Sequence, residues 1–186
     1  MHYLITLSLI IIAIFITFYF LYKPESPKTI PETPSEAVVT LAQSAATEAQ
    51  LPTEEAIKIA NVALESASTP KGQKAIIDLT QQAVVPEAAE PSKLNEAVKT
   101  AITDIKTTQT QNAIDSVNTL AKQAASTESV DIKDITKSAN VALQSTSTLK
   151  GQQAVIDLTK QAVIPQAGEP SQIKKSAEIA IQDITK

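Results

Sequence analysis

Most of this chain consists of an internal sequence duplication with an offset of 79 residues. This duplication constrains the fold more than any other feature. Residues 36–107 align with 115–186, and about half of the aligned positions are identical. Because a repeated sequence indicates a repeated structure, we predict two helical repeat modules. The first module covers 35–107, the second covers 115–186, and a polar linker at 108–114 joins them.

A fainter repeat divides each module again. Similar nine-residue segments begin at positions 38, 41 and 38 residues apart, at Ala37, Ala75, Ser116 and Ala154. Four tandem units of about 40 residues are long enough for two helices each, as in HEAT- or armadillo-like solenoids. The chain lacks the signatures of tetratricopeptide and ankyrin repeats, so this prediction concerns architecture and not family membership. A compact bundle of eight helices is the alternative arrangement.

Apolar residues recur every three or four positions, as they do along one face of a helix. One such stripe consists of Leu94, Ala97, Val98, Ala101, Ile102 and Ile105. Start signals fall at Thr33-Pro34-Ser35-Glu36, which reads as a capping box, and at Thr69-Pro70. Stop signals fall at Val85-Pro86 and Ile164-Pro165. The fold class is therefore predicted to be all-α, with eight helices of roughly 12–16 residues in the body.

The N-terminal segment has a different character. Residues 3–22 form an uncharged run of twenty residues, YLITLSLIIIAIFITFYFLY. As a helix this run would be about 30 Å long, which is the thickness of the hydrocarbon core of a bilayer. It is too long for the apolar part of a signal peptide, and its far end is bulky where a cleavage site needs small residues. We predict an uncleaved, single-pass transmembrane anchor at 1–22 that contacts the lipid bilayer through residues 3–22.

A proline-rich linker follows at 23–34. Four prolines in the sequence KPESPKTIPETP favour an extended spacer between the membrane and the body. Two PxxP spacings in this segment also fit a polyproline ligand, although a plain spacer is the commoner meaning. Lys23 and Lys28 lie on the C-terminal side of the anchor, against the α-amino group on the other side, and by the positive-inside rule they favour a cytoplasmic C-terminal body.

The amino-acid composition of the rest of the chain excludes several kinds of functional site, because the residue types that they need are missing. Residues 23–186 contain no aromatic, Cys, Met, Arg or His residue. Zinc ligation by Cys or His, a Cys or His catalytic centre and base stacking on aromatic rings therefore have no residues to build on. The three glycines form neither a phosphate loop nor a dinucleotide fingerprint, and the acidic body has no concentrated basic face. We expect no catalytic, cofactor-binding or metal-binding residues, no small-molecule substrate and no nucleic-acid partner.

The best-preserved element between the modules is S-x-S-T-x-K-G-Q, at 66–73 and 145–152. In one interpretation, its Lys and Gln side chains form a matched pair of partner contacts: Lys71, Gln73, Lys150 and Gln152. In the other, which we favour, Ser and Thr cap a helix, and both modules keep the glycine because both make the same turn. Asp78 and Asp157 lie between apolar positions and are expected to face solvent or to cap a neighbouring helix.

These observations predict a single-pass membrane protein with a structural, scaffold or adaptor role, which is not an enzyme. The usual interface anchors Trp, Tyr and Arg are missing from the body, so weak or avidity-based protein contacts, or self-association, are expected. A core of Ala, Val, Ile and Leu alone predicts modest stability or oligomerisation. One alternative is a protein whose amphipathic helices lie on the lipid surface, although the body lacks the basic and aromatic residues typical of such helices. A viral envelope or virion membrane component fits the same pattern.

Overall fold

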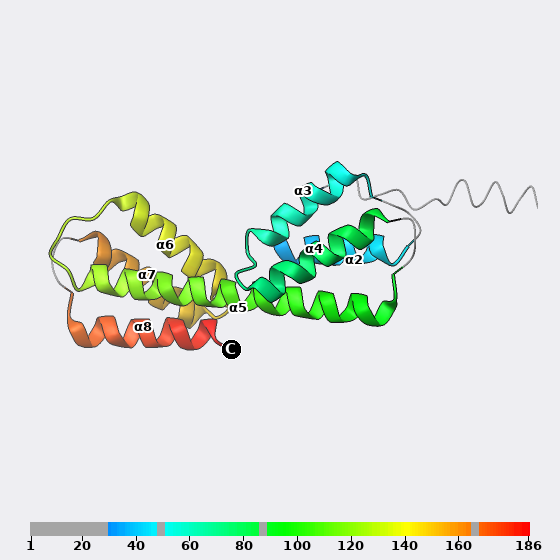
Figure 1. Ribbon diagram of the computed structural model, residues 1–186. Coiled ribbons are helices and arrows are strands. Elements are labelled where there is room, and N and C mark those ends of the chain that lie inside the picture. Colours follow the sequence, from blue (N-terminus) through cyan, green and yellow to red (C-terminus); the bar gives the residue numbers. More distant parts are fainter. Residues whose placement is uncertain (1–29, 48–50, 86–88, 165–167) are drawn as a thin grey trace, which may run out of the picture. The chain divides into compact units, whose positions relative to one another are not determined.

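A computed structural model describes residues 30–47, 51–85, 89–164 and 168–186. All regular secondary structure in these ranges is helical, so the all-α prediction is confirmed (Figure 1). The helices are α2 (Pro34–Ala45), α3 (Thr53–Leu64), α4 (Pro70–Val84), α5 (Pro91–Ala124), α6 (Ile132–Ser145), α7 (Leu149–Val163) and α8 (Pro170–Ile184).

The predicted membrane span at residues 3–22 and most of the proline-rich linker lie outside the described residues. Within the part of the chain that the structure describes, no helix combines the length and the apolar character that crossing a membrane requires.

The helix starts follow the capping signals in the sequence. The Thr33 hydroxyl oxygen accepts a hydrogen bond from the Glu36 backbone N–H, and the Glu36 carboxylate accepts one from the Thr33 backbone N–H, each at 3.3 Å. This is the predicted capping box, and α2 begins at Pro34 directly after it. The helices α4 and α7 end at Val84 and Val163, close to the prolines that were expected to stop them.

The segment 108–114, which was expected to be a linker, is instead helical. It lies inside α5, a helix of 34 residues that joins the last helical segment of the first module to the first helical segment of the second. The described part of the chain therefore contains seven helices, where eight shorter ones were predicted. Residues 108–114 contain no Pro or Gly that would break a helix, and the fully buried Ala113 gives the segment a packed face.

By proximity of its residues, the chain divides into two compact units. The second unit contains residues 64–73 and 99–186, and therefore the whole second module. In this unit, α7 packs against α8 and α6, as Figure 1 shows. One core cluster draws all of its buried members from residues 117–180: Val117, Leu120, Ala124, Ile135, Ala139, Ala142, Ala154, Val155, Leu158, Ala162, Ile173 and Ala180.

The buried residues of the first module repeat this pattern 79 positions earlier. The matched buried pairs include Val38 with Val117, Leu41 with Leu120, Ile76 with Val155, Leu79 with Leu158, Leu94 with Ile173, and Ala101 with Ala180. The duplication in the sequence is therefore a duplication of the core.

Candidate functional site

The S-x-S-T-x-K-G-Q element forms the N-terminal turn of α4 in the first module and of α7 in the second. The Thr69 hydroxyl accepts a hydrogen bond from the Gly72 backbone N–H at 3.0 Å, and Thr148 makes the same bond with Gly151 at 3.0 Å. This confirms the interpretation of the threonines as helix caps.

A second cap comes from an aspartate that lies more than thirty residues further along the chain. Asp104, in α5, accepts hydrogen bonds from the Thr69 backbone N–H at 3.3 and 3.1 Å. Its counterpart Asp183, in α8, accepts bonds from the backbone N–H groups of Ser147 and Thr148 at 2.8 and 3.0 Å. Both aspartates are buried, with 7% and 6% of their surface exposed. The carboxylate of each therefore stabilises the positive end of the neighbouring helix and satisfies its free N–H groups.

The two glycines are explained by the same contact. The expectation that a turn requires them is wrong, because both lie within helices and neither has a positive φ. A Cβ atom on Gly72 would lie 2.6 Å from Cβ of Asp104, and one on Gly151 would lie 2.8 Å from Cβ of Asp183. A side chain at either position would therefore overlap the aspartate that caps the helix.

The hydrogen bonds also affect the ionisation of Asp183. The backbone N–H of Thr148 donates to the carboxylate and lowers the pKa of Asp183 below its ordinary value of 3.8. Burial acts in the opposite direction, while further bonds from the Thr148 side chain and from Ser147 add to the lowering. The net result is a carboxylate that stays charged where it contacts the helix end.

The four residues proposed as partner contacts lie beside these caps. Lys71 and Lys150 are exposed in the first turns of α4 and α7. The Gln73 side chain donates to the Ala67 carbonyl oxygen at 3.1 Å, and Gln152 is half-buried. The lysines are thus accessible, while Gln73 has a structural bond of its own. Their role as partner contacts stays a prediction.

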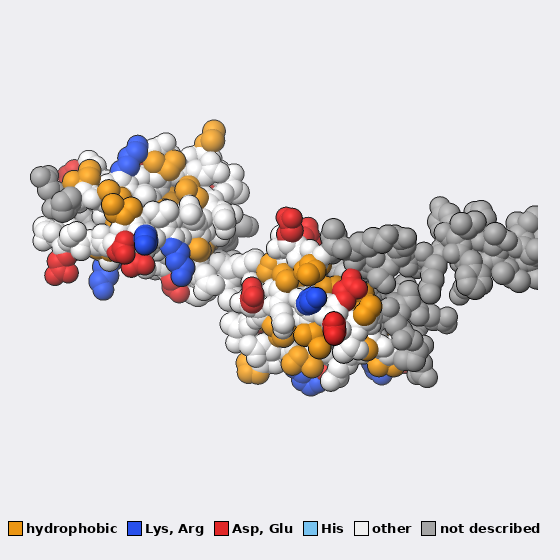
Figure 2. Space-filling view, turned by 90° about the horizontal axis from the view of Figure 1, so that it is seen from above, with side chains coloured by type: hydrophobic (Ala, Val, Ile, Leu, Met, Phe, Trp, Pro, Cys, Tyr) orange, Lys and Arg blue, Asp and Glu red, His pale blue; other side chains and the backbone are white. Residues whose placement is uncertain are grey.

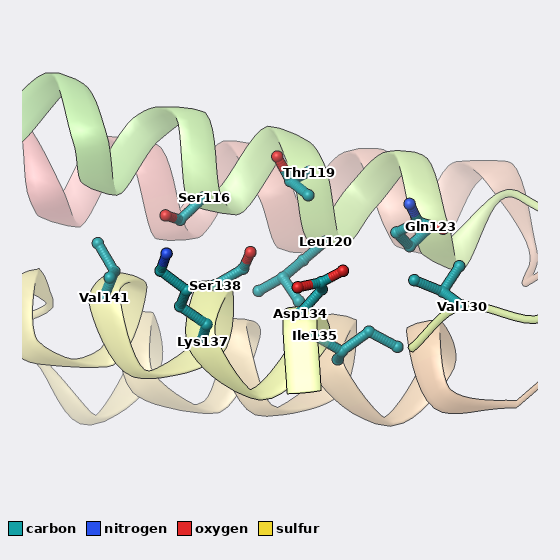
Figure 3. Close-up of a pocket in the computed structure, with 10 residues that line it drawn as sticks. All are labelled: Ser116, Thr119, Leu120, Gln123, Val130, Asp134, Ile135, Lys137, Ser138 and Val141. Carbon is teal, nitrogen blue, oxygen red and sulfur yellow. The ribbon is translucent and has the colours of Figure 1, made fainter. Parts of the chain in front are cut away.

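A groove of about 400 Å³ lies in the second unit between α5 and α6. In Figure 3 its side chains come from the two helices and from the loop between them: Ser116, Thr119, Leu120, Gln123, Val130, Asp134, Ile135, Lys137, Ser138 and Val141. The fully buried Leu120 and the nearly buried Ile135 contribute apolar surface, whereas Asp134 and Lys137 are exposed.

Two of the groove residues are serines that replace buried apolar residues of the first module. Ser116 and Ser138 correspond to Ala37 and Ile59, both of which are fully buried. The first module has the large side chain at Ile59 and a small one at Ala56. The second module has the small side chain at Ser138 and the large one at Ile135, one helical turn earlier. This exchange leaves small, half-buried hydroxyl side chains at the groove, where the first module has an aliphatic side chain in its core.

Reasoning from the sequence missed the roles of Asp104 and Asp183. A signal was present, because each lies among apolar residues on the core stripe of its helix, at the same position in both modules. Asp78 and Asp157, which had been considered instead, are half-buried and bind side chains of their own helices. Lys74 Nζ is 2.8 Å from Oδ2 of Asp78, and Gln153 donates to Asp157 at 2.8 Å.

No group of three or more His, Cys, Asp or Glu side chains suited to hold a metal ion occurs within residues 30–47, 51–85, 89–164 and 168–186. No family model, curated protein or solved structure matches the chain.

Proposed function

We propose that this protein is a single-pass, membrane-anchored scaffold or adaptor whose helical-repeat body binds other proteins and performs no catalysis. The observation that carries the proposal is the joining of a twenty-residue uncharged run at 3–22 to a duplicated helical body in the same chain. A run of that length is typical of a transmembrane anchor, and repeated helical modules commonly serve as binding surfaces.

The finer architecture belongs to this proposal. We infer tandem helical-hairpin repeats in which each module forms a four-segment helical bundle with its own core. Support comes from the core cluster drawn wholly from residues 117–180 and from its repetition 79 residues earlier. A solenoid would instead bury each hairpin mainly against the next.

The strongest sequence motif supports a structural interpretation of the body. In both modules, the threonine of S-x-S-T-x-K-G-Q caps a helix, and the glycine leaves room for the side chain of an aspartate. The charged side chain of the motif, Lys71 in the first module and Lys150 in the second, is exposed in both copies. Two equivalent, weak contacts on one chain suit a partner that itself has two binding sites.

The anchor is tested by extraction of the full chain from membranes with alkaline carbonate. We expect the chain to remain with the lipid, because a spanning helix is not released by high pH. Substitution of Ile11 and Ile14 by Lys places charges near the middle of the run, at a cost of about 2.5–3.5 kcal/mol each, and should release the protein.

The same experiment distinguishes the transmembrane anchor from the alternative in which the helices of the body lie on the lipid surface. A surface-bound protein would be released by carbonate whether or not the charges were introduced. Release of the unaltered chain would therefore refute the anchor.

A further inference from the structure

The outer face of α7 carries an apolar stripe that nothing in the described structure covers. Leu149, Ile156 and Val163 are 85%, 37% and 47% exposed. They are spaced seven residues apart, so they lie along nearly one line of the helix. The opposite face of α7 holds the buried residues Gly151, Ala154, Val155, Leu158 and Ala162. The helix therefore has a core face and a second apolar face.

The first module does not offer an equivalent stripe. At the position of Leu149 it has Pro70, and Val84, which corresponds to Val163, is half-buried. Among these three positions only Ile77, at 46%, is an exposed large apolar residue. Figure 2 shows apolar side chains reaching the surface between charged ones in both parts of the molecule. The fully formed stripe is thus a feature of the second module.

The charges of the two modules also differ. Residues 35–107 carry ten acidic residues and six lysines, which gives a net charge of -4. Residues 115–186 carry eight acidic residues and eight lysines, so the second module is neutral. Two copies of the first module repel each other, whereas two copies of the second do not, and zero net charge promotes association.

We propose that α7 is a self-association surface, which binds the same face of α7 in a second copy of this chain in an antiparallel orientation. The proposal rests on the scaffold role proposed above and names its partner. In two helices that pack along a shared seam, apolar residues recur in two rows with a seven-residue spacing, and Leu149, Ile156 and Val163 supply one of these rows, while the polar residues Gln152 and Thr159 occupy the other. A symmetric pair centred on Ile156 would bring Leu149 of one copy next to Val163 of the other.

Charge selects the antiparallel orientation. In a parallel pair, Lys160, which lies beside the stripe, would be level with Lys160 of the second copy. In the antiparallel pair, Lys160 lies four residues from the centre and faces Gln152, whose side-chain carbonyl can accept a hydrogen bond. The second arrangement therefore avoids like-charge contacts along the seam.

The size of the face predicts a weak interaction. A stable complex usually buries about 800 Å² on each partner and uses about 20–30 residues a side. One helix face with three apolar residues is far smaller. The contact would therefore depend on a high local concentration, which anchoring in one membrane supplies.

Disulfide cross-linking tests this contact directly, because the chain has no cysteine of its own. The full chain in detergent micelles is prepared with Ile156→Cys, or with Ile77→Cys as the matched control on α4, and is oxidised mildly. We expect Ile156→Cys to give several times more covalent dimer than Ile77→Cys. Equal yields, or no dimer from Ile156→Cys, would overturn the proposal.

Orientation is tested by mixing a Leu149→Cys chain with a Val163→Cys chain that carries a longer tag. The antiparallel pair predicts that the mixed dimer exceeds both homodimers, and a dominant Leu149→Cys homodimer would refute it. As a measurement without oxidation, Ile156→Lys should weaken self-association in sedimentation velocity by about tenfold or more, while Ile77→Lys leaves it unchanged. A chain that resists carbonate but fails these tests keeps its anchor and loses only the α7 contact.

Discussion

At the scale of single residues, the structure is organised by two matched contacts, between Gly72 and Asp104 and between Gly151 and Asp183. The threonine caps were predictable because a cap acts on backbone groups two or three residues away. The aspartate caps were not, since Asp183 acts on N–H groups 35 and 36 residues earlier in the chain. Only the packing of α8 against α7 brings them together.

Replacing Gly151 by Ala tests the close approach. Alanine in place of a helical glycine ordinarily stabilises a protein by about 0.5–1 kcal/mol. Here we expect destabilisation by about 1–3 kcal/mol, because the new Cβ would overlap Asp183 and force the two helices apart. Urea unfolding measures the change. Gln153→Ala, on the exposed side of the same helix, is the control and should stay within about 0.5 kcal/mol of the unaltered protein.

The ionisation of Asp183 gives a pH-dependent prediction. Its folded pKa is lowered from 3.8, so its charge stabilises the fold at pH values above the ordinary value. This contribution is lost as the pH falls below 3.8 and through the lower, folded pKa. The unfolding midpoints of the unaltered chain and of Asp183→Asn should therefore differ at pH 7 and converge between pH 3.8 and more acidic values. A difference that stays constant over this range would show that the charge has no part in the cap.

At the scale of helices, the informative element is α5. The sequence predicted its two ends as separate helices, because the modules repeat and the residues between them are polar. Polarity alone does not end a helix, however. Thr107, Ser116 and Thr119 direct their hydroxyl groups to backbone carbonyls one turn earlier, and Gln111 donates to Asp115 at 2.9 Å. The polar residues thus make bonds within the helix.

A proline at Gln109 distinguishes a helix from a linker. Within a continuous α5 it removes a backbone hydrogen bond and clashes with the preceding turn, which should cost about 3 kcal/mol or more. Thermal unfolding followed by circular dichroism measures the effect. Gln109→Ala should be nearly neutral, and so should Thr127→Pro in the loop after α5. If Gln109→Pro melted like Gln109→Ala, residues 108–114 would be a linker after all.

At the scale of the whole molecule, the chain carries one core twice. The repeat length and the all-α class could be read from periodicity, and so could part of the core: of the six residues in the stripe from Leu94 to Ile105, Leu94, Ala101 and Ile105 are buried. Compensating changes in the core could not be predicted in this way. Where the first module has Ile59 the second has Ser138, and the loss of this large side chain is offset by Ile135 one turn away. Pairwise compensation of this kind depends on which side chains meet in space.

If each module has its own core, a cavity in one should leave the other intact. Leu79→Ala and Leu158→Ala each remove a fully buried side chain at the same position of the repeat. We expect each to cost about 2–5 kcal/mol locally. In hydrogen exchange, Leu158→Ala should reduce the protection of α6, α7 and α8 much more than that of α2 and α3, and Leu79→Ala should do the reverse. Equal loss throughout would mean that the two modules unfold as one.

The repeated core also has a consequence for how the chain folds. Because matched helices bury similar side chains, a collapsing chain can place α7 where α4 belongs and still cover nearly the same apolar surface. Such exchanged pairings are competing minima, and they slow the search for the native state or lead to swapped assemblies. The positions where the modules differ, such as Ile59 against Ser138 or Ala56 against Ile135, are therefore the ones that make each helix fit its own module best. Making the two copies identical would remove that preference and would leave the chain with several near-equal ways to fold.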